Sequence, residues 1–185
     1  QTFYDKIFHL QPSHFLTIKL KDLVLGVAID LPKRWWWPSI KEQVISVEDA
    51  AKKIREIFLK NIKLQLRSDV PIGAALSGGV DSSSIVCAIR YLEPDMLIHT
   101  FSFLANDPDL NEEEWIDIIN DHVDAIPHKV KIKSDDIIND LDEMIKAQAE
   151  PFGSTSIYAQ YKVFKAARDA GITVTLDGQG ADELL

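Results

Sequence analysis

The residues best suited to chemistry lie in the segment from Ile72 to Ile89, which reads IGAALSGGVDSSSIVCAI. A short apolar run typical of a buried strand ends before Ser77 to Gly79, where two glycines allow a tight turn that most side chains would forbid. Ser82 to Ser84 are favourable helix-start residues, and apolar residues then continue at helical spacing. A strand, a glycine turn and a helix start direct backbone N–H groups and the helix dipole at one point, which predicts a phosphate-binding loop.

Asp81 is the unusual member of this loop. A carboxylate inside a phosphate site would repel the ligand unless a cation lies between them, so Asp81 implies Mg²⁺. The chain contains no Gly-Lys-Ser/Thr sequence, which excludes a Walker A loop. An ordinary serine-rich helix start after a glycine turn is the structural alternative.

A second stretch, residues 174–184, repeats this logic. An apolar strand ends, Gly178 and Gly180 turn the chain, and acidic residues follow. Ligands of open parallel sheets lie beyond the carboxyl ends of the strands, so both loops would open at the same edge. If the two strands are neighbours, Asp81 and Asp182 can hold one Mg²⁺ between them and the phosphates of a nucleotide. Taken alone, the second stretch is equally compatible with a plain turn.

The elements that must position these loops are strands alternating with helices. We expect strands at residues 72–76, 97–103, 128–132 and 173–176, and helices at 46–66, 111–123, 134–149 and 156–170, besides the helix after the first loop. Such alternation predicts a parallel α/β sheet with right-handed crossovers. The acidic residues at 107–114 are interpreted as a solvated helix start rather than a metal site.

The N-terminal residues have a different character. Residues 15–20 and 22–29 are predicted to form two strands of a hairpin, which alone would be marginal in water. Residues 31–40, which read LPKRWWWPSI, are predicted to be a connector. Its three tryptophans suggest either an aromatic plug against a domain surface, which we favour, or a stacking site.

Composition limits the classes of function. The chain has 185 residues, 46% of them hydrophobic and 26% charged, as in an ordinary globular protein. A net charge of −9 argues against a general nucleic-acid binder. No apolar run has the length of a membrane span, so no membrane partner is expected. The single cysteine, Cys87, is interpreted as a small buried side chain rather than a reactive thiol, which fits a reducing, cytoplasmic setting.

Several motifs resemble known families. SGGVDSS, residues 77–83, resembles the PP-loop (SGGxDS) of the ATP pyrophosphatases, which cleave ATP between the α- and β-phosphates to adenylate a substrate. DGQGADELL, residues 177–185, resembles the motif that follows the PP-loop in glutamine-dependent asparagine synthetases. RSDVPIGAALSGGVDSS is similar to that family's approach to the PP-loop, and FYDKIFHLQPSHFLTI to the end of its N-terminal glutaminase domain. The resemblance covers nearly the whole chain.

This resemblance implies a fold and an activity. Residues 41–185 would be the N-terminal part of a Rossmann-like PP-loop synthetase domain, and residues 1–40 the C-terminal remnant of a β-rich glutaminase domain plus a linker. The implied enzyme is a carbon–nitrogen ligase that uses ATP and Mg²⁺ to adenylate aspartate and then forms asparagine with ammonia from glutamine, releasing AMP and PPi. A homodimer is one assembly that we consider for the full-length protein. The alternatives are a relative that adenylates another carboxylate, as β-lactam synthetases do, and a non-catalytic nucleotide-binding module.

The resemblance also implies site residues. Those that match nucleotide contacts are Leu76, Ser77, Gly78, Gly79, Asp81, Ser82, Phe103, Asp177, Gly178 and Asp182. Asp81 and Asp182 match the Mg²⁺-linked carboxylates. Glu150 matches a glutamate near the acceptor, where it would act as a general base, although an ion-paired or capping glutamate before Pro151 is an equal alternative. Asp177 stands where many relatives carry Ser, which adds a negative charge near the nucleotide.

Two absences bear on the implied activity. The family's glutaminase reaction uses an N-terminal cysteine, and position 1 is Gln1, while Cys87 lies in the wrong domain to replace it. The chain also stops at Leu185, before the helical part that completes the acceptor pocket in that family. We therefore expect an ATP-site core that is inactive as an enzyme by itself.

Overall fold

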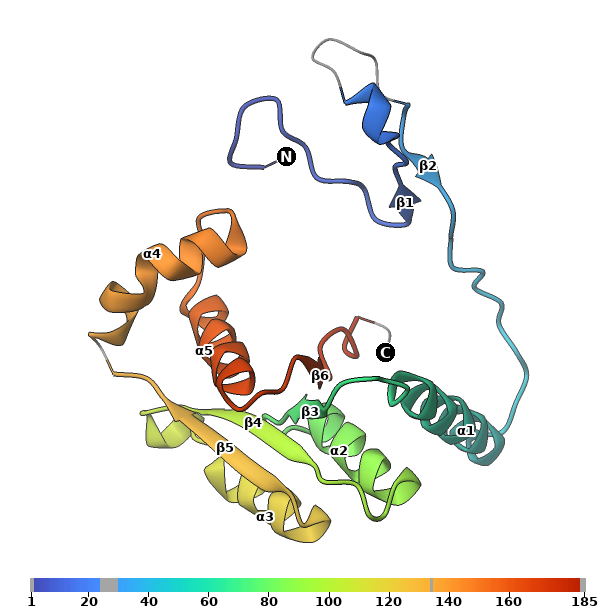
Figure 1. Cartoon of the computed structure of the whole chain (residues 1–185). Coiled ribbons are helices and arrows are strands. Elements are labelled where there is room, and N and C mark those ends of the chain that lie inside the picture. Colours follow the sequence, from blue (N-terminus) through green and yellow to red (C-terminus); the bar gives the residue numbers. More distant parts are fainter. Residues whose placement is uncertain (1, 24–29, 134, 184–185) are drawn as a thin grey trace. The chain divides into compact units, whose positions relative to one another are not determined.

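The computed structural model describes residues 2–23, 30–133 and 135–183, and the chain divides into two units, residues 1–45 and 46–185 (Figure 1). In the first unit, β1 (His14–Phe15) pairs antiparallel with β2 (Lys33–Arg34). Trp35 extends this pairing, since its N–H donates to the carbonyl oxygen of Ser13 at 2.9 Å.

The predicted hairpin is therefore wrong at residues 16–23. Beyond Phe15 the first predicted strand, residues 15–20, is not a strand, and Leu20–Asp22 forms a 3₁₀ helix, η1. The side chains of Leu16 and Ile18 are 37% and 39% exposed, so the weak alternation buries no apolar face that would stabilise a strand. Most of the second predicted strand, residues 24–29, lies outside the described residues. The strand partner is instead β2, within the predicted connector.

The three tryptophans that follow β2 are all more than half exposed. The guanidinium of Arg34 lies over the ring of Trp37, 3.7 Å from its centroid, which is the geometry of a cation–π contact. Packing of this aromatic run against a domain surface stays a prediction.

The second unit is built on a four-stranded sheet. Its strands are β3 (Ile72–Ala75), β4 (His99–Leu104), β5 (Ile126–Lys131) and β6 (Val174–Leu176), in the spatial order β5-β4-β3-β6. Every neighbouring pair is parallel, which confirms the predicted α/β fold with a parallel sheet. The last strand in sequence, β6, pairs with the first, β3, so the two predicted loops leave adjacent strands.

Helices cover both faces of this sheet (Figure 1). They are α1 (Val47–Gln65), α2 (Val80–Leu92), α3 (Glu113–Val123) and α5 (Thr155–Asp169). A further helix, α4 (Asp136–Gln148), packs on α5, and a 3₁₀ helix, η2, lies at Pro108–Leu110. The predicted helices are confirmed to within two residues at each end. Ser46 caps α1 as expected, because its Oγ accepts a hydrogen bond from the N–H of Asp49 at 3.1 Å. Among the described residues, no helix combines the length and apolarity needed to cross a membrane.

The core has two parts, one on each face of the sheet. The larger part joins α1, α2 and α3 to the strands through buried residues such as Val86, Ile89 and Ile116. The smaller part packs α5 on the other face through Phe101, Val163, Ala167 and Ile172. Gly73 is required here, because a Cβ at this position would lie 2.8 Å from Cε2 of Phe101. The sheet is thus fixed from both sides beneath the edge where the loops emerge.

Cys87 agrees with its sequence-based interpretation. It is half-buried on α2 and packs against the larger core. Burial raises the pKa of its thiol, which disfavours the reactive thiolate.

Candidate functional site

The first loop, residues 77–82, connects β3 to α2 and is held by its own hydrogen bonds. The buried Oγ of Ser82 accepts from the N–H of Ser77 at 3.2 Å and donates to the carbonyl oxygen of Gly79 at 3.2 Å. The Oγ atoms of Ser77 and Ser82 are also 3.0 Å apart, at hydrogen-bonding distance. The loop shape is therefore determined within six residues of sequence.

Gly78 has both a conformational and a packing role. Its φ is +88°, a left-handed value that other residues rarely adopt. A Cβ at Gly78 would lie 3.2 Å from Cβ of Trp115 and 3.3 Å from Cβ of Glu112, so the start of α3 packs directly against the first loop. This contact brings Glu112 to the site, although Glu112 precedes α3 in a stretch predicted to be only a solvated helix start.

The second loop, residues 177–183, follows β6. The Oδ1 of Asp177 accepts a hydrogen bond from the N–H of Gln179 at 2.9 Å, and Gly180 has a φ of +96°. A Cβ at Gly178 would lie 3.0 Å from the backbone nitrogen of Ser82 and 3.2 Å from Cβ of Asp81. A side chain at this position would be crowded by the backbone of α2, so the two loops touch closely at the start of α2.

The two loops, β4 and α5 surround a pocket of about 540 Å³. This volume lies within the range of small-molecule sites. Predicted nucleotide contacts that line the pocket are Leu76, Ser77, Gly79, Asp81, Ser82, Phe103, Asp177 and Gly178. The structure therefore brings together most of the residues that the sequence analysis selected.

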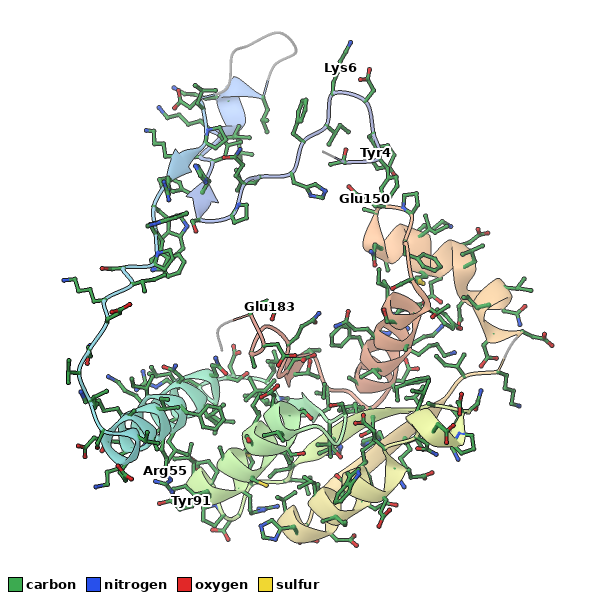
Figure 2. The ribbon with its side chains drawn as sticks, turned by 180° about the vertical axis from the view of Figure 1, so that it is seen from behind. Tyr4, Lys6, Arg55, Tyr91, Glu150 and Glu183 are labelled. Carbon is green, nitrogen blue, oxygen red and sulfur yellow. The ribbon has the colours of Figure 1, made fainter. Side chains whose placement is uncertain are left out.

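Three predicted site residues are not among those lining the pocket. Gly78 lies within the first loop but faces α3, as described above. Asp182 is exposed, in the turn that ends the second loop. Glu150 is half-buried at the connection between α4 and α5, clearly apart from Glu183 at the end of the second loop (Figure 2). The expected roles of Asp182 and Glu150 therefore stay predictions.

The charges around the pocket favour a cation. The described lining includes the carboxylates of Asp81, Glu112 and Asp177 and no lysine or arginine. Phosphates could enter such a pocket only together with a positive ion, and carboxylate oxygens are ligands that Mg²⁺ accepts. No group of three or more potential metal ligands is found among the described residues. This is compatible with Mg²⁺, which commonly uses one or two carboxylates together with substrate phosphates.

Sequence reasoning missed the wall of the pocket that α5 contributes. Ala159, Gln160, Val163 and Phe164 line it together with Gln179 of the second loop. The Nε2 of Gln160 donates to the Oε1 of Gln179 at 2.9 Å. In α5, Ala159 and Val163 are four residues apart, and so are Gln160 and Phe164. This spacing places all four on one face of the helix, and it could have identified them from the sequence.

Ion pairs with α4 support α5 from outside the pocket. The carboxylate of Asp140 accepts from Lys162 at 2.8 Å, from Lys165 at 3.2 Å and from the hydroxyl of Tyr158 at 2.7 Å. The hydrogen bonds from Lys162 and Tyr158 are the main reasons that the pKa of Asp140 falls from its ordinary value of 3.8 to about 2. Burial and Asp140 together raise the pKa of Tyr158, which stays a hydrogen-bond donor.

A histidine pair lies on the strands behind the pocket. His99 Nδ1 and His128 Nε2 are 2.9 Å apart, and the ring of His128 also stacks on Phe101, a pocket residue. Burial and the neighbouring His99 lower the pKa of His128. The lowered pKa favours the neutral form of His128, which packs on Phe101.

Comparisons with known proteins find similar sequences over most of the chain. Residues 53–185 match the family described as Asparagine synthase. The chain is 34% identical over 169 residues to the putative asparagine synthetase [glutamine-hydrolyzing] 2 of Methanocaldococcus jannaschii, covering 86% of this chain and 32% of that protein. It is 30% identical over 193 residues to the asparagine synthetase [glutamine-hydrolyzing] of Zea mays, covering 97% of this chain and 31% of that protein.

The chain thus spans about a third of the length of the curated relatives it matches. Among solved structures, an NH3-dependent NAD synthetase from Campylobacter jejuni in complex with the nitrate ion is similar with a TM-score of 0.46 and 16% identity. This similarity covers 77% of this chain and 60% of that chain.

Proposed function

Since the chain belongs to the asparagine synthase family, we propose that it supplies the ATP-binding core of a glutamine-dependent asparagine synthetase, an ATP-dependent carbon–nitrogen ligase. The observation that carries this proposal is the meeting of the two loops. The first loop follows β3, the second follows β6, and both line one pocket at the carboxyl edge of the sheet.

The proposed reaction has two steps. A carboxylate oxygen of aspartate attacks the α-phosphorus of ATP, the bond to the bridging α–β oxygen breaks, and PPi leaves. Ammonia from glutamine then attacks the acyl carbon of the aspartyl-AMP, the bond from this carbon to the phosphate oxygen breaks, and AMP leaves. The nitrogen loses a proton to a base, and asparagine is the product.

The first loop is the proposed site of the pyrophosphate. This loop leads directly into α2, and the positive end of the dipole of α2 favours a phosphate at its N-terminus. The Oγ of Ser82 is occupied in holding this loop, so its main contribution is the loop shape. Leu76 and Phe103, from β3 and β4, would contact the adenosine with Asp177 and Gly178.

Mg²⁺ would be held at the same edge. Asp81 lies in the first turn of α2 and lines the pocket, so its carboxylate would be able to hold the cation. Asp182, in the second loop, is the proposed second carboxylate. When bound, the ion would neutralise phosphate charge that the acidic pocket wall would otherwise repel.

Further parts of the proposal concern the complete protein. Residues 1–40 would be the end of a glutaminase domain with its linker, and residues 41–185 the start of the synthetase domain. We also propose a cytoplasmic location and small-molecule substrates, with no nucleic-acid or membrane partner and a homodimer as the assembly to test.

The central test is an activity assay of the complete protein with ATP, Mg²⁺ and ammonia, which bypasses the glutaminase. Aspartate should stimulate PPi release and yield asparagine, whereas another carboxylate that does so better would assign a different acceptor.

Asp81→Asn should weaken binding of Mg·ATP by about ten-fold or more, because it removes a charge that faces the cation. Ser84→Ala, an exposed position on the same helix, is the matched control, and equal effects of the two changes would contradict the role of Asp81.

Glu150 is proposed as a general base or an anchor for the acceptor. Glu150→Gln should then leave ATP affinity nearly unchanged and lower ammonia-dependent turnover by about 100-fold or more. A structural glutamate would instead cost about 1 kcal/mol of stability and little rate. Steady-state kinetics beside a melting curve distinguish these outcomes.

A further inference from the structure

The second loop carries two glycines and has little local support. Gly178 and Gly180 increase the conformational freedom of its backbone, and both Gln179 and Gly180 are exposed. Within the described part of the chain, the hydrogen bond from Gln160 to Gln179 is the one side-chain hydrogen bond that joins residues 177–183 to another element. The loop therefore depends on α5 for its position.

Asp177 fixes the position of the backbone of Gln179. Its carboxylate accepts the N–H of Gln179, two residues further on, which is an Asx turn. A serine at this position could accept the same N–H, so the turn explains how Asp can replace the Ser of many relatives. The Asp177 turn and the Gln160–Gln179 bond together form a continuous link from β6 through the second loop to α5.

This link ends where the two loops touch. Gly178 lies between Asp177 and Gln179 and approaches the backbone nitrogen of Ser82 closely, as described above. A shift of Gln179 would therefore move the segment that faces the first loop and the start of α2. Asp177, Gly178, Gln179 and Gln160 all line the same pocket.

We propose that Gln160 is a positioning residue, which acts through Gln179 to hold the second loop against the first loop in the geometry that binds a nucleotide. The nucleotide part of this inference rests on the proposed function. The loop-positioning part does not, because it concerns the unliganded chain.

The amide chemistry predicts a specific pattern of substitutions. Gln160→Leu removes both the donor and the acceptor while keeping a similar size, so the link is lost. Gln160→Glu removes the donor, but the amide of Gln179 can turn and donate to the new carboxylate. Gln160→Glu is therefore expected to keep the link, whereas Gln160→Leu loses it. If Gln160 acted only through its size, the two variants would behave alike.

The first measurement is hydrogen exchange of the backbone amides of residues 178–181 in the complete, unliganded protein. Gln160→Leu should raise their exchange rates by about five-fold, the scale of one lost hydrogen bond, while Gln160→Glu should leave them near those of the parent. Gln148→Leu, the same change on α4 outside this pocket, is the control. Unchanged exchange in Gln160→Leu would overturn the inference.

The second measurement is the Kd of α,β-methylene-ATP with Mg²⁺. Gln160→Leu, Gln179→Leu and the double variant should each weaken binding by about five-fold, because one shared bond is lost in all three. A double variant that is about 25-fold weaker would mean that the residues act independently and would overturn the link. A parent protein that does not bind the analogue, but shows the exchange pattern above, would refute the proposed function and leave the loop-positioning role supported.

Discussion

The two loops that line the pocket are held in different ways. In the first loop, Ser82 bonds to Ser77 and Gly79 within the same short segment. In the second loop, the Asp177 turn is local, but the position of the loop depends on Gln160 of α5 and on contact with the first loop. One half of the site is therefore preformed by local sequence, and the other half is placed by packing. Substitutions that disturb the packing of the second loop should therefore weaken nucleotide binding even where they lie outside the loop.

The largest expected effect comes from separating the loops. Gly178→Ala places a Cβ about 3 Å from backbone atoms of α2 that cannot rotate away, so the second loop must shift. Overpacking of this kind costs about 2 kcal/mol, which corresponds to about 30-fold in the Kd of Mg·ATP. Isothermal calorimetry on the complete protein measures this loss.

Gly153→Ala is the matched control for this change, since a Cβ at Gly153 meets nothing within 4 Å. It should leave the Kd unchanged within about two-fold, the usual scale for surface changes. A similar loss in both variants would mean that the effect is general and does not come from the contact between the loops.

A smaller effect is expected from the local support of the first loop. Ser82→Ala removes two hydrogen bonds that shape residues 77–79, and the Kd of Mg·ATP should rise by about ten-fold. The exchange rates of amides in the second loop should stay near those of the parent, because the link to Gln160 remains. Faster exchange in both loops would show that they form one cooperative unit and would contradict the view that they are held independently.

The smallest effect on the site is expected at the outer support of α5. Asp140→Asn weakens the ion pairs with Lys162 and Lys165, and the free energy of unfolding should fall by about 2 kcal/mol. The Kd should change by less than about two-fold, since α5 is also fixed to the sheet by Val163, Ala167 and Ile172. Chemical denaturation beside a binding curve separates the two quantities.

Acid provides a second check on Asp140. Its pKa in the folded protein is about 2, below the ordinary 3.8, so the charged carboxylate is favoured by folding. Its contribution to stability is therefore full above the ordinary pKa and is lost as pH falls from 3.8 towards about 2. Asp140→Asn should lack this component, so the stability difference between the two proteins should shrink over that range.

The parallel sheet and the identity of the first loop were accessible from sequence because their signals are local. The apolar run before Ser77, the glycine turn and the serine-rich helix start lie within one short segment, and the helix caps follow similarly short patterns. The hairpin expected at residues 15–29 was wrong at residues 16–23 because weak alternation is not sufficient without a surface that buries one face. Residues 24–29 of that prediction stay outside the described chain.

The sequence by itself determined the type of each loop, since glycine conformations and serine and aspartate side chains act within a few residues. Only the tertiary structure decided that β6 pairs with β3, that Gly178 reaches the backbone of Ser82, and that Glu112 and Gln160 join the pocket. These contacts link residues far apart in the chain, and their free energy comes from packing on a common sheet, which no local pattern encodes.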